Sequence, residues 1–167
     1  MAALDIAEVA PGIWSVRRGH RWHAAYIVKT SPGAVLVDTG PESSGASVMQ
    51  AFQRARVGLR SVRAILLTSA DPEASAAAPV LRERCGTRVL CSREQAPRLQ
   101  PFEVDGRIEV GDVVEERFEV VEAPDEKGGT AGRLAFRFRP SGALFVGDGS
   151  AFIEASTFSG DVRLLRR

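Results

Sequence analysis

Three stretches of this 167-residue chain share one design, an uninterrupted apolar run that ends in an acidic residue and a turn of small residues. They are VLVDTG, ILLTSADPE and LFVGDGS, and the acidic residues that end the runs are Asp38, Asp71 and Asp148. Uninterrupted apolar runs are typical of strands covered on both faces. Because the sites of layered α/β proteins assemble at strand ends, the design predicts such a fold, with three carboxylates at the ends of buried strands.

The hydrophobic periodicity changes near Arg107. Before it, short apolar strands alternate with helical segments, which the spacing of apolar residues predicts over residues 41–56 and 73–85. After it, RIEVGDVVEERFEVV and RLAFRFRP alternate apolar and polar residues, as antiparallel strands with one wet face do. No linker or internal repeat divides the chain, so we predict one α/β domain over residues 1–167, built as a layered sandwich.

Composition excludes some classes of partner. The formal net charge is +1, which gives no reason to expect nucleic acid or an anionic membrane as a partner. The first residues lack the pattern of a secretory signal, and no apolar run reaches the length of a membrane span, so we expect a cytoplasmic protein. Cys85 and Cys91 lack metal-ligand spacing and are expected to be buried free thiols.

The charged residues are unevenly placed along the chain. Residues 102–127 hold 10 acidic and 3 basic residues, a net charge of −7. A solvated acidic face is the simpler interpretation, because runs of charge usually lie at the surface. The alternative is a docking surface for a basic partner or for a second copy of the chain.

Each strand-end carboxylate also has a purely structural interpretation. Asp38 and Asp148 can accept hydrogen bonds from the backbone of the turns that follow them, and Asp71 can cap the next helix. Pro72 and Glu73 suit the first turn of a helix, where proline loses no hydrogen bond and a carboxylate is favoured by the helix dipole. The alternative is that the three carboxylates converge on one site, which their parallel placement favours.

The order of these segments resembles that of the metallo-β-lactamase fold hydrolases. The family's V-D-T-G strand end matches residues 37–40, and its I-L-L-T strand matches residues 65–68. Its later glycine turn before L-A-F matches GGTAGRLAF, and its L-F-x-G-D strand end matches residues 144–148. The resemblance covers most of the chain. It implies an α/β fold of the αββα metallo-β-lactamase type, shortened at the C-terminus because the family's last ligand histidine has no counterpart here.

The family's zinc motif, H-x-H-x-D-H, is not repeated. Aligned on Thr68, the positions of the motif and of the later ligands hold Ser69, Asp71, Glu73, Ala74, Gly129 and Asp148, of which only Asp148 keeps the family residue. Zinc in catalytic sites takes three protein ligands, usually with histidine among them, and activates a bound water. We therefore expect no zinc cofactor, no catalytic residues of the family type and no zinc-dependent hydrolysis.

Two functions remain open from the resemblance. The first is a non-catalytic pseudoenzyme that serves as a binding or assembly module. A shortened sandwich leaves apolar surface to cover, so this module is expected to form a homodimer or bind a protein partner. The second is a hydrolase with a remodelled site, in which Asp71, Glu73 and Asp148 hold a hard divalent cation such as Mg²⁺, Mn²⁺ or Ca²⁺.

The segment RRGHRWH supplies the only histidines of the chain. The corresponding loop of the family flanks the substrate pocket, so the resemblance makes His20, Trp22 and His23 candidate pocket residues. A solvent-exposed loop is the simpler interpretation. A metal-free small-molecule site around His23, Asp71 and Asp148 is a third hypothesis.

Overall fold

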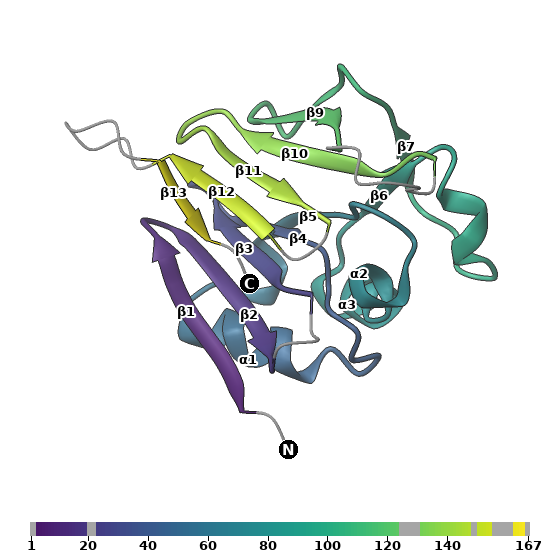
Figure 1. The fold of residues 1–167 in the computed structure, drawn as a ribbon. Coiled ribbons are helices and arrows are strands. Elements are labelled where there is room, and N and C mark those ends of the chain that lie inside the picture. The colour runs from purple at the N-terminus through teal and green to yellow at the C-terminus, as the bar shows by residue number, and fades with distance from the viewer. Residues whose placement is uncertain (1–2, 20–22, 124–130, 148–149, 155–161, 166–167) are drawn as a thin grey trace.

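The structure is a computed structural model that describes residues 3–19, 23–123, 131–147, 150–154 and 162–165. Two β-sheets lie face to face, and the helices α1, α2 and α3 lie beside the first of them (Figure 1). The predicted layered α/β sandwich is therefore confirmed. None of the described helices is long and apolar enough to cross a membrane.

The first sheet has seven strands in chain order. They are β1 (Leu4–Ala10), β2 (Ile13–Arg18), β3 (Ala25–Lys29), β4 (Ala34–Val37), β5 (Val62–Leu66), β6 (Val89–Ser92) and β7 (Gly106–Ile108). Strands β1 to β4 pair antiparallel, whereas β4 to β7 pair parallel. The expectation of antiparallel pairing from Arg107 onward is wrong for β7, which joins the first sheet parallel to β6.

The second sheet has six strands, all antiparallel, in the order β13-β12-β11-β10-β9-β8. They are β8 (Val113–Val114), β9 (Phe118–Glu122), β10 (Leu134–Phe138), β11 (Ala143–Val146), β12 (Ser150–Glu154) and β13 (Val162–Leu165). In β9 the buried and less buried residues alternate, which confirms the strand pattern predicted for this half of the chain.

Every described helix lies in a connection between two strands of the first sheet. These helices are α1 (Ala46–Arg54), the 3-10 turn η1 (Leu59–Ser61), α2 (Pro72–Ser75), α3 (Ala78–Cys85) and the 3-10 turn η2 (Ala96–Leu99). The helix predicted over 41–56 begins later, because Gly45 adopts a left-handed backbone (φ 68°) and the Glu42 carboxylate binds the Ser47 backbone N–H (2.9 Å). The helix predicted over 73–85 divides into α2 and α3.

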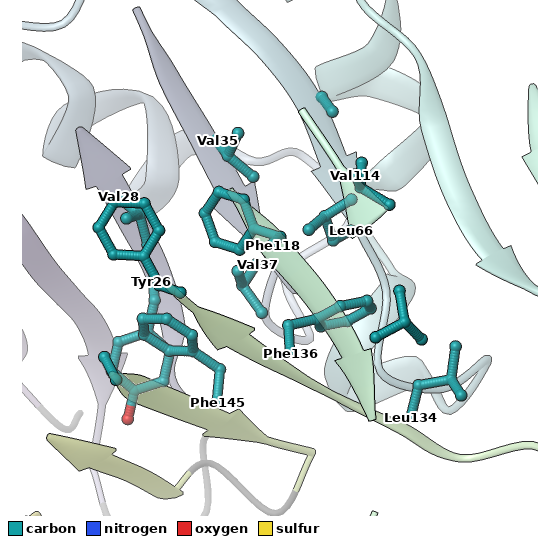
Figure 2. Close-up of a cluster of buried hydrophobic side chains, with 14 of the residues drawn as sticks. Tyr26, Val28, Val35, Val37, Leu66, Val114, Phe118, Leu134, Phe136 and Phe145 are labelled. Atoms are coloured by element: carbon teal, nitrogen blue, oxygen red, sulfur yellow. The ribbon is translucent and has the colours of Figure 1, made fainter. Parts of the chain in front are cut away.

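The core explains the uninterrupted apolar runs. Successive residues of β5 point to opposite faces, so Leu66 lies in the core between the sheets while Ile65 and Leu67 pack toward the helices. Among the described residues, the inter-sheet core combines aliphatic residues with five aromatic ones. Figure 2 shows Tyr26 of β3 against Phe145 of β11, with their ring centroids 5.1 Å apart. This packing holds the two sheets together and sets the position of the strand ends.

Candidate functional site

The carboxyl ends of β4, β5 and β6 meet at one edge of the first sheet, because these strands are parallel neighbours. The start of β10 reaches the same edge, where the Leu134 backbone N–H donates to the Thr68 carbonyl (2.9 Å). Gly147, which follows β11, also lies here, since a Cβ at that position would stand 2.5 Å from Thr68 Oγ1. Segments from both sheets therefore surround the loop that follows β5.

Asp38 links the ends of two strands. It is buried (4% exposed) and left-handed (φ 59°), and its carboxylate accepts hydrogen bonds from the Thr68 backbone N–H (2.8 Å) and hydroxyl (2.7 Å). Burial raises the pKa of Asp38 to about 7, although both hydrogen bonds from Thr68 act to lower it. The expectation that Asp38 binds its own turn is therefore wrong. Its partner is the neighbouring strand.

Ser69 and Ala74, which the resemblance aligns with the family's first and third histidines, are both buried. The Ser69 hydroxyl accepts from the Asp71 backbone N–H at 3.3 Å. The Ala74 carbonyl accepts from the backbone N–H (2.7 Å) and the hydroxyl (3.0 Å) of Thr39. These groups therefore serve local structure, and the Ala74 methyl group offers no ligand atom.

Asp71 forms ion pairs with two arginines from distant segments. Its Oδ1 lies 3.0 Å from Arg98 Nη2 on η2, and its Oδ2 accepts from Arg133 Nη2 immediately before β10. Asp71 is the N-cap residue immediately before α2, but its side chain makes no capping hydrogen bond. The predicted cap by the side chain is therefore wrong, because charge-assisted bonds to two guanidinium groups are stronger than a bond to a neutral backbone N–H.

Gln95 completes the network from a fully buried position. Its Oε1 accepts from the Ala70 backbone N–H (3.0 Å) and from Arg98 Nη1 (2.7 Å), and its Nε2 donates to the Ala131 carbonyl (2.7 Å). The side chain thus joins the loop after β5, η2 and the segment before β10. Sequence reasoning missed Gln95, Arg98 and Arg133, because no local pattern distinguishes them from surface residues of the same types.

The other predicted site residues have fewer contacts. Glu73 is half-buried and forms no ion pair or hydrogen bond with any other residue in the described part of the chain. His23 is half-buried near the edge where β4 ends, since Tyr26 of β3 pairs with Val37, and its Nδ1 has no hydrogen-bond partner among residues the structure describes. The remaining four, His20, Trp22, Gly129 and Asp148, lie outside the described residues.

The described residues at this edge do not fit a zinc ion. Within the described ranges, no group of three or more histidine, cysteine, aspartate or glutamate side chains is placed to hold a metal. Both oxygens of Asp71 already face guanidinium groups, and the buried Asp38 carboxylate is bound by Thr68. The arrangement joins three segments, the loop after β5, η2 and the segment before β10, through ion pairs and amide hydrogen bonds.

Comparisons with known proteins agree with this fold. A metallo-β-lactamase from Cronobacter sakazakii with a HARLDQ motif has a TM-score of 0.69 at 18% identity, covering 90% of this chain and 64% of that one. A subclass B3 metallo-β-lactamase of Bradyrhizobium japonicum has a TM-score of 0.71 at 16% identity, covering 98% and 61%. A mutant flavo di-iron protein from Thermotoga maritima has a TM-score of 0.71 at 16% identity, covering 87% and 42%.

At such identities the structural likeness concerns the fold alone, and the chain spans less than two thirds of the length of these proteins. Among curated protein sequences, no significant match is found. The sequence profile of one family, described as the metallo-beta-lactamase superfamily, matches residues 22–160, which is most of the chain. Together with the sandwich of two sheets and the strand-end segments at one edge, this match shows that the chain belongs to the metallo-β-lactamase superfamily.

Proposed function

We propose that the chain is a metal-free member of its superfamily, a pseudoenzyme that acts as a binding or assembly module. The observation that carries this proposal is the ion pairing of Asp71 with Arg98 and Arg133. Asp71 stands where the family motif has its second histidine. At that position the chain presents a carboxylate whose two oxygens are both engaged by guanidinium groups.

Electrostatics argues against a cation at this position. Two unit charges 4 Å apart interact by about 4 kcal/mol at an effective dielectric constant of 20. A divalent ion on Asp71 would therefore be repelled by Arg98 and Arg133 unless both guanidinium groups moved away. The arginines are partly exposed (42% and 35% of their side chains), so solvent weakens this repulsion without reversing its sign.

The paired charges also supply the mechanical role that a metal would have. A metal ion holds separate segments together by binding ligands from each of them. Here Asp71, Arg98, Arg133 and Gln95 join the loop after β5, η2 and the segment before β10. The edge is thus held in place by the chain's own side chains, which supports a binding role that needs no metal.

The alternative is a hydrolase that binds a hard cation through Asp71, Glu73 and Asp148. The structure describes two of these carboxylates, Asp71 and Glu73. Of the two, only Glu73 has no ion-pair partner among the described residues. Within the described residues, that leaves one unpaired carboxylate of the set, and one alone is too few for a stable site, since Ca²⁺ and Mg²⁺ take six or more oxygen ligands. The geometry therefore favours the metal-free proposal.

Metal content and thermal stability test the two functions together. Native mass spectrometry of the purified chain should show no stoichiometric metal, and Zn²⁺, Mn²⁺, Mg²⁺ or Ca²⁺ should not raise the melting temperature. A chromogenic β-lactam should not be hydrolysed in the presence of any of these ions. Stoichiometric binding of one ion, together with hydrolysis that chelation abolishes, would overturn the proposal.

The proposed partner is a second copy of the chain or another protein. Within the described residues, the exposed large hydrophobic side chains are Val110 (55%) and Val113 (43%), both inside the acidic segment 102–127. A protein interface usually has an apolar core and a polar rim, an arrangement that two valines inside a charged segment would supply. Size-exclusion chromatography with light scattering should give a dimer mass, and a clean monomer at high concentration contradicts the homodimer.

A further inference from the structure

A small cavity lies at the opposite end of the sandwich from Asp71. Its volume is about 150 Å³, and it is lined by Thr30, Pro32, Arg63, Glu115, Glu116 and Arg117. These residues come from the turn between β3 and β4, the start of β5 and the turn between β8 and β9. Because β4 and β5 are parallel, their starts lie at the edge of the sheet opposite to their carboxyl ends.

One wall of the cavity is a carboxylate held between two arginines. Glu115 Oε2 accepts from Arg63 Nε at 3.0 Å, and its Oε1 accepts from Arg88 Nη2 at 2.5 Å. Both oxygens of Glu115 are thus engaged, and its charge is offset. Glu115 therefore orients Arg63 and leaves little negative charge to repel an anion in the cavity.

Two guanidinium groups keep unused donors at the cavity. Arg63 uses only its Nε within the described residues, and Arg117 uses only its Nη2, which donates to the Ser31 carbonyl at 3.3 Å. An arginine carries five N–H donors in a planar fork that matches a carboxylate or a phosphate. Among the lining residues, Arg63 and Arg117 balance Glu115 and Glu116, and Arg88, which lies outside the lining, adds a positive charge through its ion pair with Glu115.

The backbone around the cavity is held in an unfavourable conformation. Ser31, Glu115 and Glu116 have left-handed φ values of 38°, 51° and 61°, and they account for three of the five such non-glycine residues described. Each costs on the order of 1 kcal/mol relative to glycine, so packing and ion pairs must hold them there. At Glu115 and Glu116 the positive φ values belong to the tight turn between β8 and β9, which the Arg117 N–H closes by donating to the Val114 carbonyl (3.2 Å), and this turn places Glu115 beside Arg63 and Arg88.

We propose that this cavity is a binding site for a small oxyanion, a carboxylate or phosphate group held between Arg63 and Arg117. The cavity has room for several waters, and therefore for a group of this size. Arg63 and Arg117 donate charge-assisted hydrogen bonds to the anion from two sides. Glu116, which is exposed beside them, repels the anion and lowers its affinity. This site goes beyond the proposed function and does not depend on it.

Isothermal titration calorimetry of the full chain tests the site, with inorganic phosphate and acetate titrated separately at constant ionic strength. We expect saturable binding of at least one of them at millimolar concentration. Arg117→Gln should weaken binding at least tenfold, which corresponds to about 1.4 kcal/mol or more for the loss of hydrogen bonds to a charged group. Glu116→Gln should strengthen binding, because it removes the repelling charge.

The opposite signs of the two variants distinguish a site from general destabilisation. Arg107→Gln is the matched control, because Arg107 is an exposed arginine on β7 that forms no ion pair among the described residues. The affinity of Arg107→Gln for the titrated anion should equal that of the unmodified chain. Binding of phosphate alone assigns a phosphate group, and binding of acetate alone assigns a carboxylate. Binding of neither, or equal weakening by Arg117→Gln and Arg107→Gln, would overturn the proposal.

Discussion

The two ends of the seven-stranded sheet use their polar groups differently. At the carboxyl ends of β4 and β5, the polar side chains bind one another, as Asp38 binds Thr68 and Asp71 binds Arg98 and Arg133. At the opposite end, Arg63 and Arg117 keep unused donors beside a cavity. Among the described residues, Asp38 and Asp71 at the one end are bound within the chain, whereas two arginines at the other end keep donors beside a cavity.

Burial explains the difference. Asp38, Ser69 and Gln95 are buried, and a buried polar group must find a hydrogen-bond partner in the protein. At the cavity end, Arg63 is half-exposed (50% of its side chain), so water can satisfy its remaining donors until a ligand replaces it. Four changes, in order of expected effect, test whether the two ends really differ in this way.

The largest effect concerns the pH dependence that Asp38 contributes. The pKa of Asp38 rises from 3.8 to about 7 on folding, so between these values the folded chain holds a proton that the unfolded chain has lost. Stability from this group is therefore full below pH 4 and is lost as the pH rises toward 7, by up to about 4 kcal/mol in total. Urea titrations of the unmodified chain and of Asp38→Asn, from pH 4 to pH 8, measure the difference.

The Asp38→Asn variant keeps an oxygen that accepts from the Thr68 backbone N–H and has no proton to lose. Other carboxylates titrate equally in both proteins, so the difference between the two curves isolates Asp38. As the pH rises from 4 to 7, the free energy of unfolding of Asp38→Asn should increase relative to that of the unmodified chain. A difference that is constant over this range contradicts the raised pKa.

Gln95→Leu should give the next largest effect. The leucine leaves the Ala70 N–H and the Ala131 carbonyl without their partner in the protein interior. We expect a loss of roughly 2–3 kcal/mol in the free energy of unfolding. The matched control is Gln100→Leu, an exposed glutamine that should change stability by less than about 0.5 kcal/mol. Equal effects of the two variants would mean that Gln95 does not join the three segments.

Asp71→Asn should destabilise the chain by about 1–2 kcal/mol, because Arg98 and Arg133 lose their shared counter-charge. Salt screens the remaining repulsion between the arginines, so the deficit should shrink in 1 M NaCl, where the screening length is about 3 Å. Thermal unfolding at low and high salt measures both effects. A different result would indicate a metal role for Asp71. In that case Asp71→Asn would raise the free energy of unfolding relative to the unmodified chain only after divalent cations are removed.

Arg88→Gln at the cavity end should have the smallest effect. Arg88 is 48% exposed and shares Glu115 with Arg63, so its loss leaves Glu115 one partner. We expect a change of about 0.5 kcal/mol or less, as for other exposed ion pairs. Chemical denaturation alongside Asp71→Asn tests the comparison directly. A cost as large as that of Asp71→Asn would show that both ends depend equally on internal pairing.

Much of the fold follows from local patterns. The apolar run in ILLT predicts a strand covered on both faces, and the structure places Leu66 and Leu67 in two different cores. The segments VLVDTG and LAF carry the resemblance that the family match confirms. Helix boundaries are harder to predict from local patterns. The start of α1 is set by the left-handed backbone of Gly45 and by the hydrogen bond from the Ser47 N–H to the Glu42 carboxylate.

By itself, the sequence determined the fold class and the arrival of Asp38 and Asp71 at one edge, because an apolar run marks a buried strand within a few consecutive residues. The family followed from a resemblance of motifs, and the family match agrees with it. Only the tertiary structure decided what those carboxylates bind. Arg98 and Arg133 lie 27 and 62 residues from Asp71 along the chain, and nothing local marks them as its partners. An ion pair depends on distance in space, so its partners are defined only when packing has brought distant segments together.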